Sequence, residues 1–342
     1  PQVHRGLVKG RQTMLKKLKD SGLDPKNDVQ MGAIVADIPT GEIQAVLAGR
    51  DHQIGFHRVL DAKRQIGSLV KPFVVAAAIE EDPRLHSGTL VRDEAVSIRD
   101  AKGDVWAPKN YDKTEKGVVR LETVIANSIN QATVHLALGL GFDVILERLS
   151  DYGIPVGPSK PPATVLGVSE MSPYQIATRF QGLLNQGYLT PLKAVRSVVD
   201  DNGGPLTRRA FQSTQLMSAQ AAAQVDHMMR VGATVGTGKA FGQRYPEIMA
   251  SKTGTTDDGR DAWFVGADGR RLGVTWVGFD DNRKAGLVGS VAALPVISDA
   301  FRYIQRSNRS TKLPEGLEFR HLNQSGQIVD ASGHGAERRP IP

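Results

Sequence analysis

The sequence predicts a mixed α/β (α+β) fold in which both ends of the chain contribute to one sheet and a mainly helical segment lies between them. Two observations carry this prediction. Strand-like runs with turn residues occur near both ends, and helical patterns broken by Gly and Pro fill residues 70–245. A hydrophobic content of 40% and a charged content of 23% are typical of globular proteins. We therefore expect a sheet lobe and a helical lobe with a ligand-binding cleft between them.

The strand signals come in two groups. Residues 31–38 and 43–49 are strand-like runs joined by the turn residues PTGE, which predicts a β-hairpin. Residues 248–256, 262–266 and 272–278 predict an antiparallel meander, and a helix over 292–305 should pack on it. Two shorter runs at 317–322 and 327–331 predict a small C-terminal hairpin, with disorder expected after residue 333.

Helices are predicted from apolar spacing over residues 73–81, 121–126, 131–138, 142–152, 173–185 and 219–231. Residues 73–79 are apolar all round, which favours a helix buried on every side. Residues 1–30 contain one helical pattern and are predicted as a lead-in or linker segment, followed by a single domain over 31–310 and a partly disordered extension over 311–342.

The net charge of +7 is concentrated in part at the lysine-rich first twenty residues. Without an aromatic platform or a binding motif, this charge does not indicate a nucleic-acid partner. The absence of cysteine excludes disulfides, thiolate metal sites and cysteine nucleophiles. No apolar run approaches the ~18 residues of a membrane span, and no signal peptide precedes Pro1, so we expect this chain to be part of a longer protein.

Three short strings, SLVK at 68–71, SIN at 128–130 and KTGTT at 252–256, occur in this order along the chain. In the first string, Pro72 lacks an N–H and favours the first turn of a helix, so Ser68 and Lys71 should lie one turn apart on the same face. A lysine amine can activate a serine hydroxyl when desolvation or nearby positive charge lowers its pKa. The apolar helix behind Lys71 would supply that desolvation.

The other two strings complete one reaction. Ser128 could relay a proton to a leaving amine, while Asn130 could bind Lys71 and a substrate amide. A strand that contains Gly254 lets a substrate backbone lie along its edge, Lys252 attracts a carboxylate, and the N–H of Thr255 could join that of Ser68 in an oxyanion hole. Each string alone also has an ordinary structural explanation as a helix cap, a surface lysine or a strand end. Their joint occurrence in this order favours the catalytic interpretation.

Other motifs fail on inspection. The stretch GTGKA at 236–240 lacks the glycine and the Ser or Thr of a phosphate loop. No G-x-S-x-G elbow and no H-E-x-x-H zinc site is present, so the eight histidines are interpreted as structural. Neither a metal nor a cofactor is expected.

At these residues the chain resembles the transpeptidase domain of bifunctional class A penicillin-binding proteins. The resemblance covers residues 31–307 and includes the segments 37–42, 56–58, 108–111, 166–173, 235–238 and 261–266. It implies the penicillin-binding and serine β-lactamase-like transpeptidase fold, an antiparallel five-stranded sheet flanked by helices plus an all-helical lobe. Two departures are His57, where the family usually has Asn, and Gln65-Ile66, where some relatives have Pro before Gly67.

The resemblance also implies a role for each site residue. Ser68 would attack the bond between the last two D-alanines of a peptidoglycan stem peptide, with Lys71 as base and Ser128 as proton relay. Asn130 would bind the donor amide, Lys252 and Thr253 the terminal carboxylate, and Thr255 the oxyanion, with Gly254 on the same strand. An amine from a neighbouring stem would then resolve the acyl-enzyme.

Partners and location follow from the same resemblance. The implied partners are stem peptides, β-lactam antibiotics, an N-terminal glycosyltransferase domain with a membrane anchor, and cell-wall regulators. The implied location is the bacterial inner membrane, with this domain in the periplasm.

Three alternatives share the strings: a D,D-carboxypeptidase, a serine β-lactamase and a β-lactam sensor. β-Lactamases of the S-D-N class use a water-activating Glu in an E-x-x-L-N loop, and here residue 181 of the matching stretch is Gln. This difference favours acyl transfer to an amine.

Overall fold

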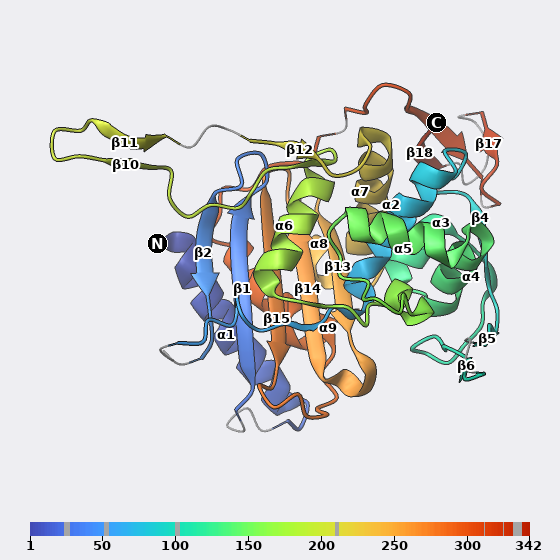
Figure 1. The fold of residues 1–342 in the computed structure, drawn as a ribbon, viewed down its shortest axis with the longest axis horizontal. Helices are drawn as coiled ribbons and strands as arrows, with labels where there is room; N and C mark the ends of the chain where they lie inside the picture. Colours follow the sequence, from blue (N-terminus) through green and yellow to red (C-terminus); the bar gives the residue numbers. More distant parts are fainter. Residues whose placement is uncertain are drawn as a thin grey trace.

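The computed structural model describes residues 1–23, 28–50, 55–99, 103–208, 212–310, 312–323, 325–330 and 337–342. Its centre is a five-stranded antiparallel sheet with the strand order β13-β14-β15-β1-β2 (Figure 1). The bounds of these strands are β1 Gln30–Asp37, β2 Ile43–Leu47, β13 Ala250–Thr255, β14 Asp261–Ala267 and β15 Arg271–Gly278. The β1–β15 pair joins the two ends of the chain, as the sequence predicted.

Strand β1 is buried along its whole length because helices cover both faces of the sheet. Its side chains alternate between two cores, as the two-residue repeat of a strand requires. Met31, Ala33 and Val35 belong to the core on one face of the sheet, whereas Ile34 and Ala36 belong to the core on the other face.

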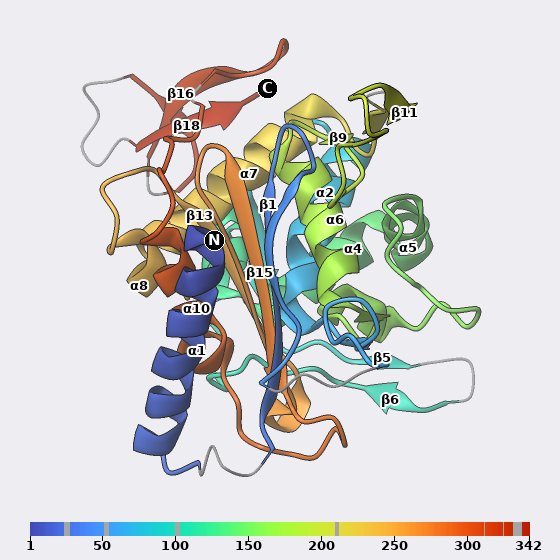
Figure 2. The ribbon, with the colours of Figure 1, turned by 90° about the vertical axis from the view of Figure 1, so that its left-hand side faces the viewer.

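One layer of helices covers the face of the sheet to which Met31, Ala33 and Val35 point. They are α1 (Gln2–Asp20), α8 (Lys239–Gly242), α9 (Gly289–Ala292) and α10 (Leu294–Phe301). Figure 2 shows α1 and α10 side by side on one face of the sheet. The helix predicted over 292–305 is found as α10, but it ends at Phe301, and Ala292 at its predicted start belongs to the separate helix α9. Pro295 lies in the first turn of α10. Pro lacks an N–H and is tolerated at the start of a helix.

The opposite layer contains the helices predicted from the middle of the chain. Helices α6 (Pro173–Leu184) and α7 (Ala219–Thr234) pack directly on the sheet, and α2 (Lys71–Glu81) lies behind them. Every residue of α2 from Lys71 to Ile79 is buried, which confirms the prediction of an enclosed helix. The remaining helices of this region are α3 (Leu121–Asn127), α4 (Asn130–Leu140) and α5 (Phe142–Asp151).

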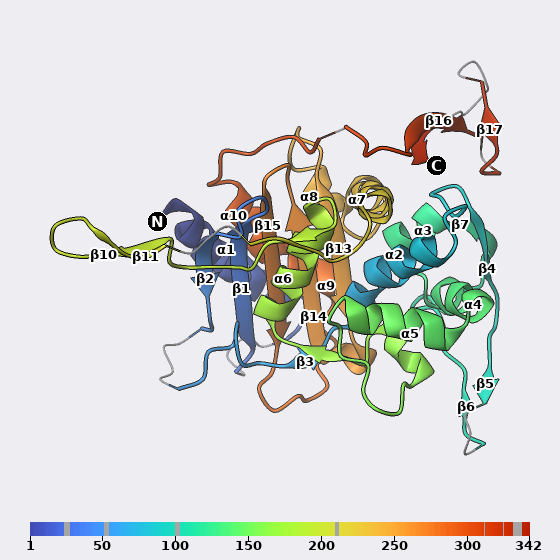
Figure 3. The same ribbon diagram turned by 45° about the horizontal axis from the view of Figure 1, so that its top comes forward.

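Several two-stranded sheets were not predicted. They are β3 (Arg64–Gln65) with β8 (Glu170–Met171), β4 (Leu90–Asp93) with β7 (Gly117–Arg120), β5 (Ile98–Arg99) with β6 (Val105–Trp106), β9 (Tyr188–Leu189) with β12 (Thr214–Gln215), and β10 (Ser197–Val199) with β11 (Pro205–Arg208). Figures 1 and 3 show the β10–β11 hairpin projecting away from the body. The described residues also contain the 3₁₀ turns η1 Gly67–Val70, η2 Pro162–Leu166 and η3 Asp257–Gly259.

The C-terminal region forms a three-stranded sheet in the order β17-β16-β18. The predicted hairpin is confirmed, with β16 at Glu318–Leu322 and a shorter β17 at Ile328–Val329. The expected disorder after residue 333 is wrong for β18 (Glu337–Ile341), which pairs with β16 along its whole length. Residues 334–336, on which the expectation also falls, lie outside the described residues. The domain boundaries at about residues 30 and 310 stay predictions.

No helix within the described ranges is both long enough and apolar enough to cross a membrane.

Candidate active site

Ser68 lies in η1, which continues directly into α2 at Lys71. The sequence predicted a helical first turn here, and the turn is of the tighter 3₁₀ type. Gly67 enters it with φ at 51°, and a Cβ at this position would lie 2.8 Å from the main-chain oxygen of Thr255. Glycine therefore permits both the left-handed backbone and the close approach to β13.

Lys71 is completely buried behind Ser68. Its Nζ donates hydrogen bonds to the main-chain oxygen of Ser128 (2.6 Å), to Asn130 Oδ1 (2.6 Å) and to Ser128 Oγ (3.4 Å). Burial is the main cause that lowers the pKa of Lys71 well below its usual value, and the positive charge of Lys252 lowers it further, while Asp93 opposes both. The amine is thereby biased toward its neutral form.

Ser128 lies between α3 and α4 with φ at 60° and ψ at 43°, the left-handed region. This conformation costs a non-glycine residue about 1–3 kcal/mol and is common at functional sites. It lets one residue meet two lysines: the main-chain oxygen of Ser128 accepts from Lys71, and its Oγ accepts from Lys252 at 2.8 Å.

Lys252 is also buried, with 1% of the residue exposed. Besides Ser128 Oγ, its Nζ donates to the main-chain oxygen of Thr253 at 2.9 Å. Burial lowers the pKa of Lys252 to about 7. The Thr253 hydroxyl in turn donates to Thr237 Oγ1 at 2.7 Å, which connects β13 to the segment that follows α7.

Gly254 allows the η1 turn to pack against β13. A Cβ at this position would lie 2.9 Å from Trp263 Cβ, 3.0 Å from Leu69 Cγ and 3.1 Å from the main-chain oxygen of Ile66. Strand β13 is the edge strand of the sheet, and among the described residues no strand pairs with its outer edge. Such an edge is the kind to which an extended peptide adds as a further strand.

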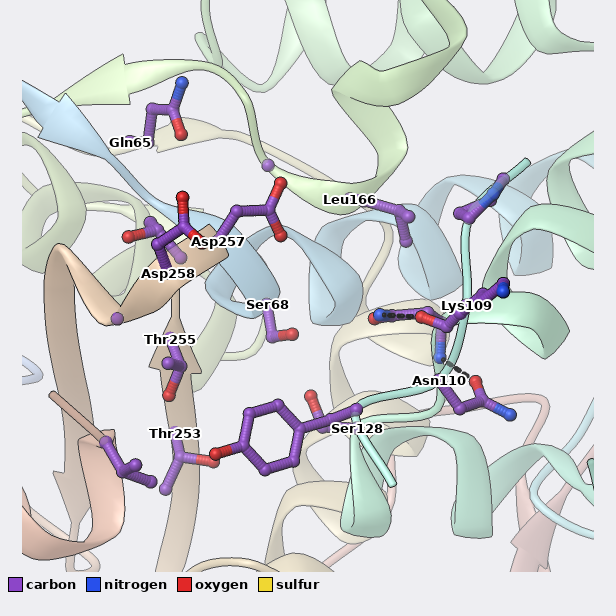
Figure 4. Close-up of a pocket in the computed structure, with 18 of the residues that line it drawn as sticks. Gln65, Ser68, Lys109, Asn110, Ser128, Leu166, Thr253, Thr255, Asp257 and Asp258 are labelled. Atoms are coloured by element: carbon purple, nitrogen blue, oxygen red, sulfur yellow. Dashed lines mark hydrogen bonds between the residues drawn. The ribbon is translucent and has the colours of Figure 1, made fainter. Parts of the chain in front are cut away.

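The pocket in front of these residues has a volume of about 850 Å³. Figure 4 shows Ser68 between Ser128 on one side and Thr253 and Thr255 of β13 on the other. Asn130 lines the same pocket, while Lys71, Lys252 and Gly254 lie behind its wall. The structure thus brings all eight predicted residues together, although they come from three distant parts of the chain.

Sequence reasoning assigned no role to Asp93, Asn110 or Thr237, all of which contact the site. Asn110 and Thr237 line the pocket, and Asp93 is buried behind Asn110. The available signal was the resemblance itself, because the segments 108–111 and 235–238 belong to it. Of the two departures, Gln65 lies on the pocket wall, and its main-chain oxygen accepts from Trp263 Nε1 at 2.8 Å.

Residues 31–291 match the family model for the penicillin binding protein transpeptidase domain. Penicillin-binding protein 1B of Vibrio cholerae is 37% identical over 309 residues, which cover 89% of this chain and 40% of that protein. Among solved structures, penicillin-binding protein 1A from Haemophilus influenzae aligns with a TM-score of 0.83 at 21% identity, over 92% of this chain and 53% of the other. The PonA1 protein from Mycobacterium tuberculosis, solved in complex with penicillin V, aligns with a TM-score of 0.75 at 22% identity, over 96% and 88%.

The chain therefore belongs to the penicillin-binding protein transpeptidase domain family. The predicted fold and the resemblance to the transpeptidase domain of penicillin-binding proteins are confirmed, with similarity to penicillin-binding protein 1B. The chain spans about 40% of the length of the curated relative from Vibrio cholerae.

Proposed function

We propose that this chain is a D,D-transpeptidase that cross-links peptidoglycan stem peptides through an acyl-enzyme on Ser68 and is acylated by β-lactams. The observation that carries the proposal is the buried Lys71, whose amine has a lowered pKa and binds both Ser128 and Asn130 beside Ser68. A neutral amine in this place is the base that a serine nucleophile needs.

The first half-reaction begins when Ser68 Oγ attacks the carbonyl between the last two D-alanines and its proton passes to Lys71. The N–H groups of Ser68 and Thr255 would stabilise the oxyanion. When the tetrahedral intermediate collapses, the C–N bond breaks, and the leaving D-alanine amine takes up the proton through Ser128 Oγ. The ester on Ser68 is the acyl-enzyme.

In the second half-reaction, the amine of a neighbouring stem peptide attacks the ester. Its proton returns by the same route, an amide bond forms and the Ser68 hydroxyl is released. Lys252 and Thr253 would bind the terminal carboxylate of the donor, since Thr253 lines the pocket and a lysine directly behind the wall attracts an anion. One N–H of the Asn130 amide is left for the donor peptide, because the other donates to the main-chain oxygen of Lys109.

The structure also bears on the β-lactamase alternative. Gln181 stands where the E-x-x-L-N loop of these β-lactamases has its water-activating Glu. Its side chain is fully buried and does not line the pocket. Its amide donates to the main-chain oxygen of Ile38 and accepts from the N–H of Thr190. The carboxylates that line the pocket among the described residues, Asp257 and Asp258, are exposed. This arrangement favours a long-lived acyl-enzyme.

The length of the relatives supports a larger protein. Since the chain spans about 40% of the curated relative from Vibrio cholerae, the proposal includes an N-terminal glycosyltransferase domain and a membrane anchor outside this chain. The domain would act in the periplasm at the inner membrane, with cell-wall regulators as further partners and without nucleic acid.

The test is mass spectrometry of the intact chain after treatment with benzylpenicillin. The wild type should gain one penicilloyl adduct that persists for minutes or longer, and Ser68→Ala should gain none. The matched control is Ser290→Ala, which removes another hydroxyl from the pocket wall and should leave the adduct in place. An adduct on Ser68→Ala would refute the nucleophile, and rapid loss of the adduct with turnover would favour a hydrolase. Products formed from a stem peptide with and without an acceptor amine separate transpeptidase from carboxypeptidase and from sensor.

A further inference from the structure

The side chain of Asn110, on the loop between β6 and β7, uses its full hydrogen-bonding capacity. Its Oδ1 accepts from the main-chain N–H groups of Asn130 (2.9 Å) and Gln131 (3.1 Å). Its Nδ2 donates to Asp93 Oδ1 (2.7 Å) and to the main-chain oxygen of Thr114 (2.8 Å). Because donors lie on one side of the amide and acceptors on the other, these partners fix its orientation.

Asn110 acts as a remote cap for helix α4. The residue at the N-cap position, Ile129, has no side-chain oxygen, and the first N–H groups of a helix have no partner within it. Asn110 Oδ1 satisfies the first two of these groups, at Asn130 and Gln131. The start of α4 is therefore held by a loop that lies about twenty residues earlier in the chain.

The same loop also orients the side chain of Asn130. Its Nδ2 donates to the main-chain oxygen of Lys109 at 2.8 Å, which leaves Oδ1 to accept from Lys71 Nζ at 2.6 Å. Main chain and side chain of Asn130 are thus both fixed by residues 109–110. A shift of this loop would move the acceptor that holds the Lys71 amine in place.

Asp93 holds the loop between β6 and β7 at two points. It ends β4, is completely buried, and accepts from Asn110 Nδ2 with one oxygen and from the N–H of Lys116 (3.0 Å) with the other. Its charge also acts on Lys71. Burial and Lys252 of β13 lower the pKa of Lys71, and Asp93 of β4 raises it.

We propose that Asp93 and Asn110 are positioning residues for acylation. They hold Asn130 so that its side-chain oxygen Oδ1 keeps the Lys71 amine in place for its reaction with Ser68. This inference rests on the proposed role of Lys71 as the base for Ser68. Neither residue touches the reacting atoms. Both act through Asn130, and Asp93 also acts on the Lys71 amine through its charge.

The first experiment compares Asn110→Leu with Gln181→Leu. Both changes replace a buried amide by an apolar side chain of similar size. The amide of Asn110 joins three main-chain groups and the Asp93 carboxylate, whereas that of Gln181 joins two main-chain groups and lies away from the pocket. The rate constant of acylation by benzylpenicillin is measured on the intact chain, together with the Tm. We expect acylation to slow by about 10- to 100-fold in Asn110→Leu, as displacement of a catalytic group does. Gln181→Leu should retain the wild-type rate constant at a comparable loss of Tm.

The second experiment follows the acylation rate constant of Asp93→Asn against pH. Removal of the carboxylate charge lowers the pKa of Lys71 further, so the neutral base persists to lower pH and the acid limb of the profile should move to lower pH. Asp268→Asn is the control, because Asp268 is equally buried and accepts from the N–H groups of Arg270 and Arg271 in a turn of the sheet. Its profile should match that of the wild type.

The proposal is overturned if Asn110→Leu acylates no more slowly than Gln181→Leu, or if the acid limb of Asp93→Asn stays in place. Should Asn110→Leu not fold, the pH profile of Asp93→Asn alone decides. A failure of the proposed function looks different: the wild type would form no adduct, or Ser68→Ala would keep it.

Discussion

At the scale of single residues, the site places two buried lysines around Ser128. Both Lys71 and Lys252 donate to Ser128 Oγ, and Lys71 also donates to the main-chain oxygen of Ser128. Within the described chain, the structure shows no carboxylate in hydrogen-bond contact with either amine. Two ammonium groups so close in a poorly solvated place would repel each other strongly. The lowered pKa of both amines relieves this repulsion.

The cost of burying Lys252 predicts that Lys252→Met stabilises the protein while it impairs acylation. The free energy of unfolding at pH 7 should rise by roughly 1–4 kcal/mol, the range found when buried ionic groups are replaced by apolar ones. In the wild type, the unfolded chain binds more protons at Lys252 than the folded chain between pH 7 and the usual value of 10.5, so stability at this site rises with pH over that window. The advantage of the variant should therefore shrink toward pH 10.

Urea unfolding at several pH values, with acylation rates alongside, checks this prediction. Lys16→Met is the control, because Lys16 is an exposed lysine of α1 and its replacement should change neither quantity appreciably. A Lys252→Met variant that is less stable than the wild type at pH 7 would contradict the argument.

The same scale shows why part of the site could be predicted and part could not. Ser68 and Lys71 are three residues apart, so their shared face follows from helical spacing alone. Asn110 contacts Asp93 across 17 residues of sequence and Asn130 across 20, and no local pattern specifies such pairs. Its role becomes visible only when the loop and the start of α4 are placed in space.

At the scale of elements, long periodic segments were predicted well and short ones were not. The five strands of the main sheet and the six helices of the middle segment carry enough residues for a repeat to show. Pairs such as β5–β6 and β9–β12 have two residues in each strand, so their pairing depends on tertiary contacts. Strand β18 is longer, but it was also missed because the charged residues 337–339 and Pro340 give no alternating pattern.

Helix α1 illustrates an element whose packing the sequence did not reveal. Its glycines Gly6 and Gly10 lie one turn apart and face α10 without space for a side chain. A Cβ at Gly6 would lie 2.7 Å from Ala300 Cα, and one at Gly10 would lie 2.5 Å from the main-chain oxygen of Val296. The two helices are thus in main-chain contact, which only glycine permits.

This contact predicts opposite effects for the same substitution in two helices. Gly10→Ala should lower the free energy of unfolding by about 1–3 kcal/mol because the methyl group overpacks against α10. Gly139→Ala, in α4, should raise it by about 0.5–1 kcal/mol, since no atom lies within 4 Å of the new Cβ and alanine restricts the unfolded chain. Denaturant unfolding measures both, and equal effects in the two helices would refute the close contact.

At the scale of the whole molecule, the C-terminal sheet connects the end of the chain to the helix that precedes Ser128. Arg339 of β18 forms an ion pair with Glu122 of α3 at 2.5 Å, and Arg120 binds the same carboxylate. Arg120, at the end of β7, and Arg339 both also contact Glu337. Strand β7, helix α3 and strand β18 therefore share one network of charges. At the tip of this sheet, Gly326 approaches Gly88 so closely that a Cβ on Gly326 would lie 2.0 Å from the Gly88 oxygen.

The network predicts that Arg339→Met weakens the molecule through α3. Glu122 is nearly buried, and loss of one of its two arginine partners should cost about 1–3 kcal/mol in the free energy of unfolding. Helix α3 leads directly to Ser128. In the Arg339→Met variant, the amide hydrogens of α3 should exchange faster than those of the central sheet. Arg338→Met is the matched control: Arg338 is the adjacent residue of the same strand, is exposed and stacks on Phe319, so its replacement should leave exchange in α3 unchanged. Equal protection of α3 in both variants would mean that the C-terminal sheet lies against the helix without stabilising it.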